Sequence, residues 1–234
     1  MGWHVIQFLF PTVAVLAFAP ALLLLYYSLS GYTWPKSQTV YFDDRWIFGF
    51  VAVGIIVGAG IFFVELIFSS LGFIYAILFT VVEELIVVTI LNFPRMRRKG
   101  SGRFYGFALG TAIAAGLAMG EYAELFTHSG YDLPGMAVLA VYSIGLELMG
   151  GSTGCVIGRA VEQGKLPYGI LIAVAFQSLF VFINIPVLSF SPSLLTVMFA
   201  TAGIAISLPF YFHVVRRVLP QPSASAPGKR KRYI

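Results

Sequence analysis

Long apolar stretches limit this chain to a small number of possible folds. Seven runs reach the roughly 20 residues that a helix needs to cross a bilayer. They cover residues 4–29, 47–69, 71–93, 104–126, 135–159, 167–190 and 194–214. Only 11% of the 234 residues are charged, which is far less than a soluble domain exposes. Because the runs do not alternate as barrel strands do, they predict an all-α polytopic membrane protein, a bundle of about seven transmembrane helices.

The connections between the runs predict one membrane domain and a tail. Only Ser69, Ser70 and their neighbours separate the second run from the third, which predicts a tight helical hairpin. Residues 1–217 are expected to form the transmembrane domain. Residues 218–234, rich in Pro, Ser and Ala and then basic, are expected to form a disordered tail near anionic lipid.

The basic residues predict the orientation of the bundle. With seven spans, all fifteen Lys and Arg residues fall on one side of the membrane. They lie at 36 and 45, at 95–103, at 159 and 165, at 216 and 217, and at 229–232. Since basic loops stay cytoplasmic, the N-terminus is expected outside and the C-terminus in the cytoplasm. This retention accounts for the net charge of +5, so a nucleic-acid partner is not expected.

Six glutamates fall inside the predicted spans, without any Lys or Arg to neutralise them: Glu65, Glu83, Glu84, Glu121, Glu124 and Glu147. An acidic side chain near the middle of a membrane costs about 2.5–3.5 kcal/mol on insertion scales. The carboxyl groups are therefore expected to be protonated, hydrated in a cavity or bound to a cation. For Glu65 and Glu124, near the outer surface, a purely structural role is an equal alternative.

Helical geometry predicts where these groups point. Glu83 and Glu84 differ by about 100° around one helix, so one is expected to face a reacting centre and the other to support it. Glu121 and Glu124 share a face of the next helix at i, i+3 spacing. Glu147 and Gln177 (the latter a polar residue in an apolar run) lie near the midpoints of their spans. Four helices are thus predicted to direct polar groups at a common buried cavity.

Glycines flank the Glu121 motif and predict close helix packing. They stand at positions 106, 110, 116 and 120. Small residues at such spacing let the backbones of two helices approach each other.

The positions of the histidines and the presence of a single cysteine argue against a histidine-ligated zinc site and against an internal disulfide. His4, His128 and His213 all lie at span ends, so a zinc site with two or three mid-membrane His ligands is not expected. No HExxH or GxSxG motif is present. The single cysteine, Cys155, excludes an internal disulfide and is expected to be a small packing residue.

One segment resembles a known family. The stretch "VVEELIVV", the basic loop after it and "RFYGFALGTAIAAGLAMGEYAEL" together resemble the PrsW-type intramembrane proteases over about residues 80–125. These enzymes are distantly similar to the CAAX-prenyl protease and bacteriocin-processing group. The resemblance implies a polytopic enzyme, of a prokaryotic plasma membrane, that cleaves membrane-anchored proteins such as anti-sigma factors. It matches Glu83 and Glu84 to the paired glutamates of the family, and Glu121 to the glutamate of its second motif.

The sequence departs from this family at defined positions. Val87 replaces a basic residue, and Tyr122 replaces an asparagine. The histidines expected in the two later spans are replaced by Glu147 or a neighbour and by Gln177.

Three hypotheses follow for the function. In a divergent protease, Glu83 or Glu84 is the general base, Glu121 is an acid partner or metal ligand, and Gln177 donates to the oxyanion. One divalent ion would then be held by Glu84, Glu121 and Glu147, with Mn or Mg favoured by oxygen ligands. In the second hypothesis the chain is an inactive pseudoprotease, a scaffold or complex subunit that binds transmembrane partners. A carboxylate-lined transporter is the weakest of the three, because inverted repeats and broken helices are not evident.

Overall fold

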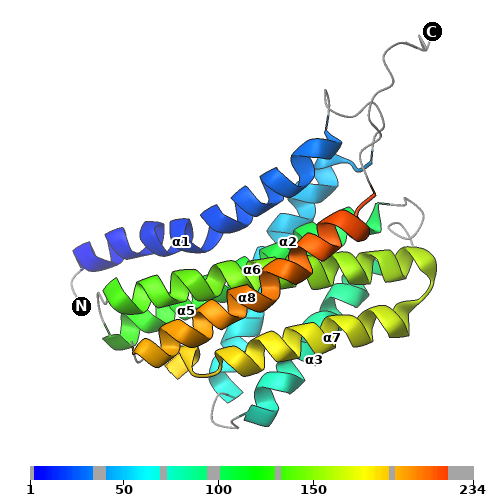
Figure 1. Cartoon of the computed structure of the whole chain (residues 1–234). Coiled ribbons are helices and arrows are strands. Elements are labelled where there is room, and N and C mark those ends of the chain that lie inside the picture. The colour runs from blue at the N-terminus through cyan, green and yellow to red at the C-terminus, as the bar shows by residue number, and fades with distance from the viewer. Residues whose placement is uncertain are drawn as a thin grey trace.

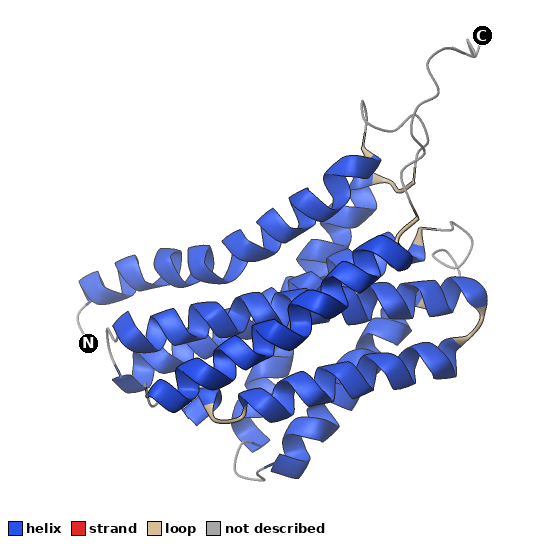
Figure 2. Ribbon diagram, viewed as in Figure 1, coloured by secondary structure: helices blue, strands red, loops and turns tan. Residues whose placement is uncertain are grey.

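The computed structural model describes residues 3–33, 41–68, 73–93, 101–129, 133–189 and 193–220. Within these ranges the chain is helical and has no strand, which confirms the all-α prediction (Figure 2). The helices are α1 (Trp3–Leu29), α2 (Asp44–Phe68), α3 (Phe73–Leu91), α5 (Gly102–Ser129), α6 (Leu133–Gln163), α7 (Leu166–Asn184) and α8 (Leu194–Arg217). Two short 3₁₀ turns, η1 (Ser30–Tyr32) and η3 (Val187–Ser189), follow α1 and α7.

Among the described residues, five helical stretches are long and apolar enough to cross a membrane. They are Pro11–Tyr32, Asp44–Phe68, Leu133–Gln163, Leu166–Asn184 and Leu194–Arg217. Large apolar side chains are exposed on them, for example Leu23, Ile56, Leu171 and Met198. Such a surface is disfavoured in water and suits the hydrocarbon core of a bilayer.

Helix α5 packs against α6, α2 and α1 and touches α3, and it lies beside α6 in Figure 1. Every residue from Phe104 to Ala118 is buried. Because these side chains face other helices and not lipid, α5 can carry many small residues where a peripheral span carries large apolar ones.

Glycines bring α5 against its two main neighbours. A Cβ atom added to Gly106 or Gly110 would overlap the carbonyl of Gly154 or Gly150 on α6. Another face of α5, at Gly116, lies against the backbone of α2 in the same way. The predicted close approach is therefore present, and it is used on two sides of the same helix.

The helix ends agree with the predicted spans to within a few residues, with two informative differences. The run predicted to reach residue 190 ends as α7 at Asn184, shortly before Pro186, because proline cannot donate to a continuing helix. The run predicted to end at 159 continues as α6 to Gln163, where Gly164 adopts a left-handed conformation (φ 67°) that closes the helix.

The predicted tight hairpin of the second and third spans is wrong. Helices α2 and α3 make few contacts with each other, while α3 packs on α7 and α2 packs on α5. The reason is the glycine face of α2: Gly54 and Gly58 lie against the α5 backbone, so α2 is held by α5 and not by its neighbour in sequence.

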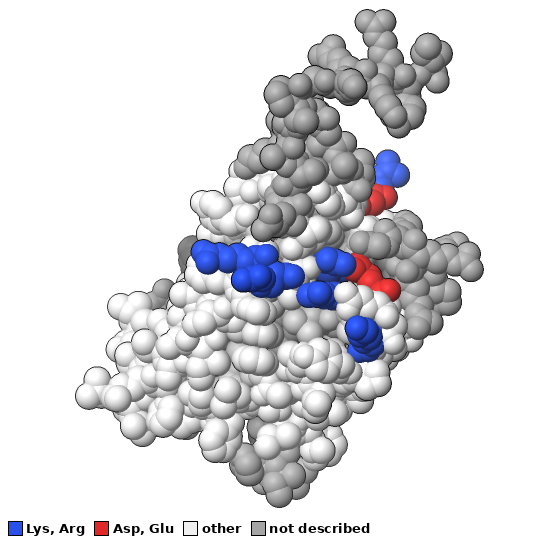
Figure 3. All heavy atoms as spheres, turned by 45° about the vertical axis from the view of Figure 1, so that its right-hand side comes forward, with Lys and Arg blue, Asp and Glu red and all other residues white. Residues whose placement is uncertain are grey.

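The basic residues that the structure describes lie at one end of the bundle (Figure 3). Arg103, at the start of α5, pairs with Glu162 near the end of α6 at 2.6 Å and donates to the carbonyl of Val218 after α8 at 2.9 Å. The Ser101 hydroxyl donates to Tyr41 O at 2.7 Å, which brings the segment before α2 to the same end. Residues 36, 95–99 and 229–232, which carry the other predicted cytoplasmic charges, lie outside the described residues, as does the predicted tail beyond residue 220.

Candidate functional site: a buried carboxylate cluster

Four of the predicted site glutamates are nearly inaccessible. The exposed fractions are 7% for Glu83, 1% for Glu84, 7% for Glu121 and 1% for Glu147. Glu124, one turn after Glu121, is half-buried. The described Lys and Arg residues lie at the basic end of the bundle and are not among the neighbours of these carboxyl groups. Burial of this kind is costly unless a proton, water or cation compensates the charge.

Glu83 and Glu84 have different surroundings, as their angular separation predicts. Gln177 on α7, itself fully buried, donates from Nε2 to Glu83 Oε2 at 3.4 Å. Glu84 points toward Thr153 on α6, whose hydroxyl donates instead to the carbonyl of Gly150 at 3.1 Å. Neither carboxyl oxygen of Glu84 has a hydrogen-bond partner among the described residues.

Glu121 is held by a tyrosine on the following helix. The Tyr142 hydroxyl on α6 donates to Glu121 Oε1 at 3.2 Å, while Glu121 Oε2 has no partner in the described part of the chain. The Tyr142 ring stacks on Phe180 of α7, with 5.7 Å between ring centroids. The packing of α5, α6 and α7 thus fixes where this hydroxyl points.

Glu65 on α2 joins the same group of side chains. It interacts electrostatically with Glu83, with Glu121 and with Tyr142. Residues from α2, α3, α5, α6 and α7 therefore lie near one another in what we call the carboxylate cluster: Glu65, Glu83, Glu121, Tyr142 and Gln177. Glu84 adjoins this cluster through Glu83 but faces Thr153 of α6.

Two members of the cluster were not among the predicted site residues. The only sequence signal for Glu65 is its position as a glutamate within a predicted span. Tyr142 had no signal, because a tyrosine in an apolar helix is usually a packing residue. Its role depends on its position across the α5–α6 interface from Glu121.

Glu147 and Glu121 share Tyr122 as a neighbour. Glu147 interacts electrostatically with Tyr122 of α5, whose hydroxyl lies 3.4 Å from Ser143 Oγ. Glu147 Oε1 has no hydrogen-bond partner within the described ranges. Among the described residues, no three His, Cys, Asp or Glu side chains are grouped so that they could hold a metal ion.

Of the three histidines, the structure describes the side chain of His213 alone. His213 lies on α8, toward the basic end. The side chains of His4 and His128 lie outside the described residues. Cys155 is fully buried on α6 and packs in the core, as predicted.

Comparisons of the chain with protein-family models, with curated proteins and with solved structures find no match.

Proposed function

We propose that this chain is a divergent PrsW-like intramembrane protease that cleaves membrane-anchored proteins at the carboxylate cluster. The observation that supports the proposal is the convergence of Glu83, Glu121 and Gln177 with Tyr142 inside an apolar bundle. Buried carboxyl groups with unsatisfied oxygens are costly, and such groups are typical of functional sites. In this proposal, water and the peptide of the substrate would satisfy them.

The donors and acceptors of the cluster suit peptide hydrolysis. In this proposal Glu84, whose two oxygens lack partners among the described residues, accepts a proton from a water molecule while the water oxygen attacks the peptide carbonyl. The oxyanion that forms would accept a hydrogen bond from Gln177 Nε2 or Tyr142 OH. The proton on Glu84 would then pass to the leaving amine as the C–N bond breaks. Glu83, held by Gln177, is the alternative base.

A divalent ion held by Glu84, Glu121 and Glu147 remains a prediction. The described residues do not form a three-ligand group. Elemental mass spectrometry of the purified and dialysed protein tests this point. One ion per chain in the wild type, lost in the double variant Glu84→Gln, Glu121→Gln, would support the ligand set.

We infer that the bundle spans a prokaryotic plasma membrane seven times, with the N-terminus outside and the C-terminus in the cytoplasm. The gathering of the described basic residues at one end of the bundle supports this orientation. In this proposal its partners are the lipid bilayer and a transmembrane protein, which is either a substrate or a partner subunit.

Cleavage can be tested without a known substrate. The wild-type protein and the Glu84→Gln and Glu121→Gln variants are each placed in liposomes with extracted membrane proteins, and new N-termini are mapped by mass spectrometry. We expect new termini near predicted transmembrane segments with the wild type only. Glu162→Gln, which changes a glutamate paired with Arg103 at the basic end, is the control and should retain cleavage. Unchanged cleavage in both Glu84→Gln and Glu121→Gln would reject the proposal.

A pseudoprotease is the alternative function. It is favoured by Gln177, which stands where the resemblance expects a histidine and is engaged with Glu83. In that case the fold would be retained to bind a transmembrane partner. Stable copurification of one membrane protein, in equal amounts with wild type and Glu84→Gln and without any new termini, would decide for this alternative.

A further inference from the structure

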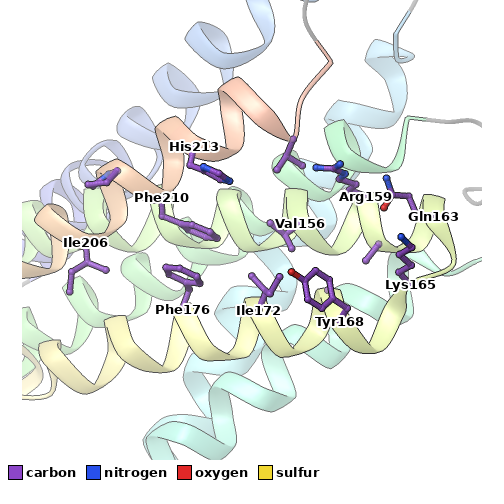
Figure 4. Close-up of a pocket in the computed structure, with 14 residues that line it drawn as sticks. Val156, Arg159, Gln163, Lys165, Tyr168, Ile172, Phe176, Ile206, Phe210 and His213 are labelled. Atoms are coloured by element: carbon purple, nitrogen blue, oxygen red, sulfur yellow. The ribbon is translucent and has the colours of Figure 1, made fainter.

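A hollow of about 980 Å³ lies between α6, α7 and α8, away from the carboxylate cluster. Figure 4 shows that α7 and α8 form its two sides and α6 its back. Its volume is at the upper end of the ~300–1,000 Å³ that enclose whole small ligands. None of the residues that line this hollow takes part in the proposed protease chemistry.

The mouth of this hollow is cationic. Arg159 on α6 and Lys165 at the start of α7 lie at the end of the hollow where the described basic residues gather. None of its lining residues is acidic. The nearby carboxylate of Glu162 is engaged by Arg103, with Nε at 2.9 Å and Nη2 at 2.6 Å. The two cationic groups are therefore not neutralised by that carboxylate.

Local backbone structure holds these charges in place. Gly164, with its positive φ, lets the chain turn sharply after α6. The turn is closed by hydrogen bonds from Lys165 N to Ala160 O at 2.9 Å and from Gly164 N to Val161 O at 3.4 Å. Arg159 Nη1 lies 3.4 Å from Arg217 O, a long contact that leaves its other nitrogens free to bind a ligand.

The depth of the hollow is apolar. Ile172 and Phe176 line it from α7, and Ile206 and Phe210 line it from α8 (Figure 4). The rings of Phe176 and Phe210 stack face to face at 4.0 Å between centroids. From Lys165 to Phe176 the groove follows α7 for 11 residues, or about 16 Å at 1.5 Å per residue.

We propose that this hollow binds an anionic phospholipid, with the phosphate between Arg159 and Lys165 and an acyl chain along Ile172 toward Phe176. A free phosphate would leave the apolar depth unfilled, and an apolar peptide segment would leave two cations without a counter-ion. A phospholipid satisfies both parts, and basic pockets between membrane helices at the cytoplasmic side bind such head groups. The binding is independent of the proposed protease activity.

Native mass spectrometry of the delipidated protein in detergent tests this inference. Dioleoyl phosphatidylglycerol is compared with dioleoyl phosphatidylcholine, which has the same acyl chains and no net charge. We expect one saturable phosphatidylglycerol site with at least about tenfold preference over phosphatidylcholine. Since a basic residue near a membrane surface contributes about 1 kcal/mol to binding an anionic lipid, the double variant Arg159→Gln, Lys165→Gln should weaken binding by roughly thirtyfold.

Two further variants separate this site from general surface charge and from a free-phosphate site. The control Arg45→Gln, Arg217→Gln removes two charges at the same end of the bundle but outside this hollow, and it should change the affinity by less than about twofold. Ile172→Trp fills the groove without changing charge, and it should also weaken phosphatidylglycerol binding by at least about tenfold. Equal binding of the two lipids, or an equal loss in the control, would overturn the proposal. Competition by inorganic phosphate together with unchanged binding in Ile172→Trp would assign the mouth to free phosphate.

Discussion

Among the described residues, Glu84 is the one whose buried side chain has two oxygens without a hydrogen-bond partner. This side chain is 1% exposed. A group of this kind lowers stability and persists where function requires it. Glu83, the adjacent residue, has Gln177 as a donor. Two neighbouring residues of one type thus have different physical roles, which depend on the helix that each one faces.

The variant Glu84→Met tests that interpretation. Methionine has a similar length and needs no hydrogen bond, so the change should raise the unfolding free energy by about 1–3 kcal/mol. Cleavage should be lost in the same variant. Thermal unfolding in detergent micelles measures the first effect, and mapping of new N-termini measures the second. A marked fall in stability would instead identify Glu84 as a structural residue.

Tyr142 offers a second test at the residue scale. In Tyr142→Phe the remaining donor to Glu121 is removed, which should cost about 1–3 kcal/mol of stability. The matched control is Tyr211→Phe, whose hydroxyl lies 2.7 Å from Ser28 Oγ and far from the cluster. Both variants should lose stability in chemical unfolding, while only Tyr142→Phe should lose cleavage. If Tyr211→Phe lost as much cleavage activity as Tyr142→Phe, the effect of Tyr142 would be explained by its contribution to packing and stability alone.

At the scale of elements, α5 organises the molecule. One face carries the glycines that meet α6, and another meets α2 at Gly116. This arrangement places Glu121 beside Tyr142 and within electrostatic range of Glu65, although these three residues come from three helices. The cluster therefore depends on how closely the backbones approach.

The variant Gly110→Ala should disturb that approach. Its Cβ would overlap the backbone carbonyl of Gly150, which cannot move aside as a side-chain end can, so we expect a loss of about 1–3 kcal/mol. Gly60→Ala on α2 is the matched control, because no atom lies within 4 Å of the added methyl group. There the better helix propensity of alanine should raise stability by up to about 1 kcal/mol. Unfolding in mixed micelles with increasing SDS compares the two, and a stable Gly110→Ala would contradict the close α5–α6 contact.

At the scale of the whole molecule, charge is segregated along the bundle. The described basic side chains occupy the end formed by the starts of α2, α5 and α7 and by the ends of α6 and α8. The same end holds the mouth of the proposed lipid groove. One charged end can thus orient the protein and recruit anionic lipid.

Labelling of single cysteines tests this orientation. In a Cys155→Ala background, Lys165→Cys should react with a membrane-impermeant maleimide only when the cytoplasmic face is accessible. Leu133→Cys and Leu194→Cys, both at the opposite helix ends and exposed, should react from outside. Labelling of all three positions from the same side would contradict the seven-span topology.

The helical class, the approximate helix bounds and the segregation of charge could be predicted from the sequence, because these follow from local apolar length and from the order of loops. The sequence also singled out Glu83, Glu84, Glu121 and Gln177, because polar groups are rare in such spans. The packing of α3 on α7 and the hydrogen bond from Tyr142 to Glu121 could not be predicted in this way. Both contacts depend on how each helix is rotated about its axis and on which helix it packs against. These two properties are set by contacts between residues distant in sequence.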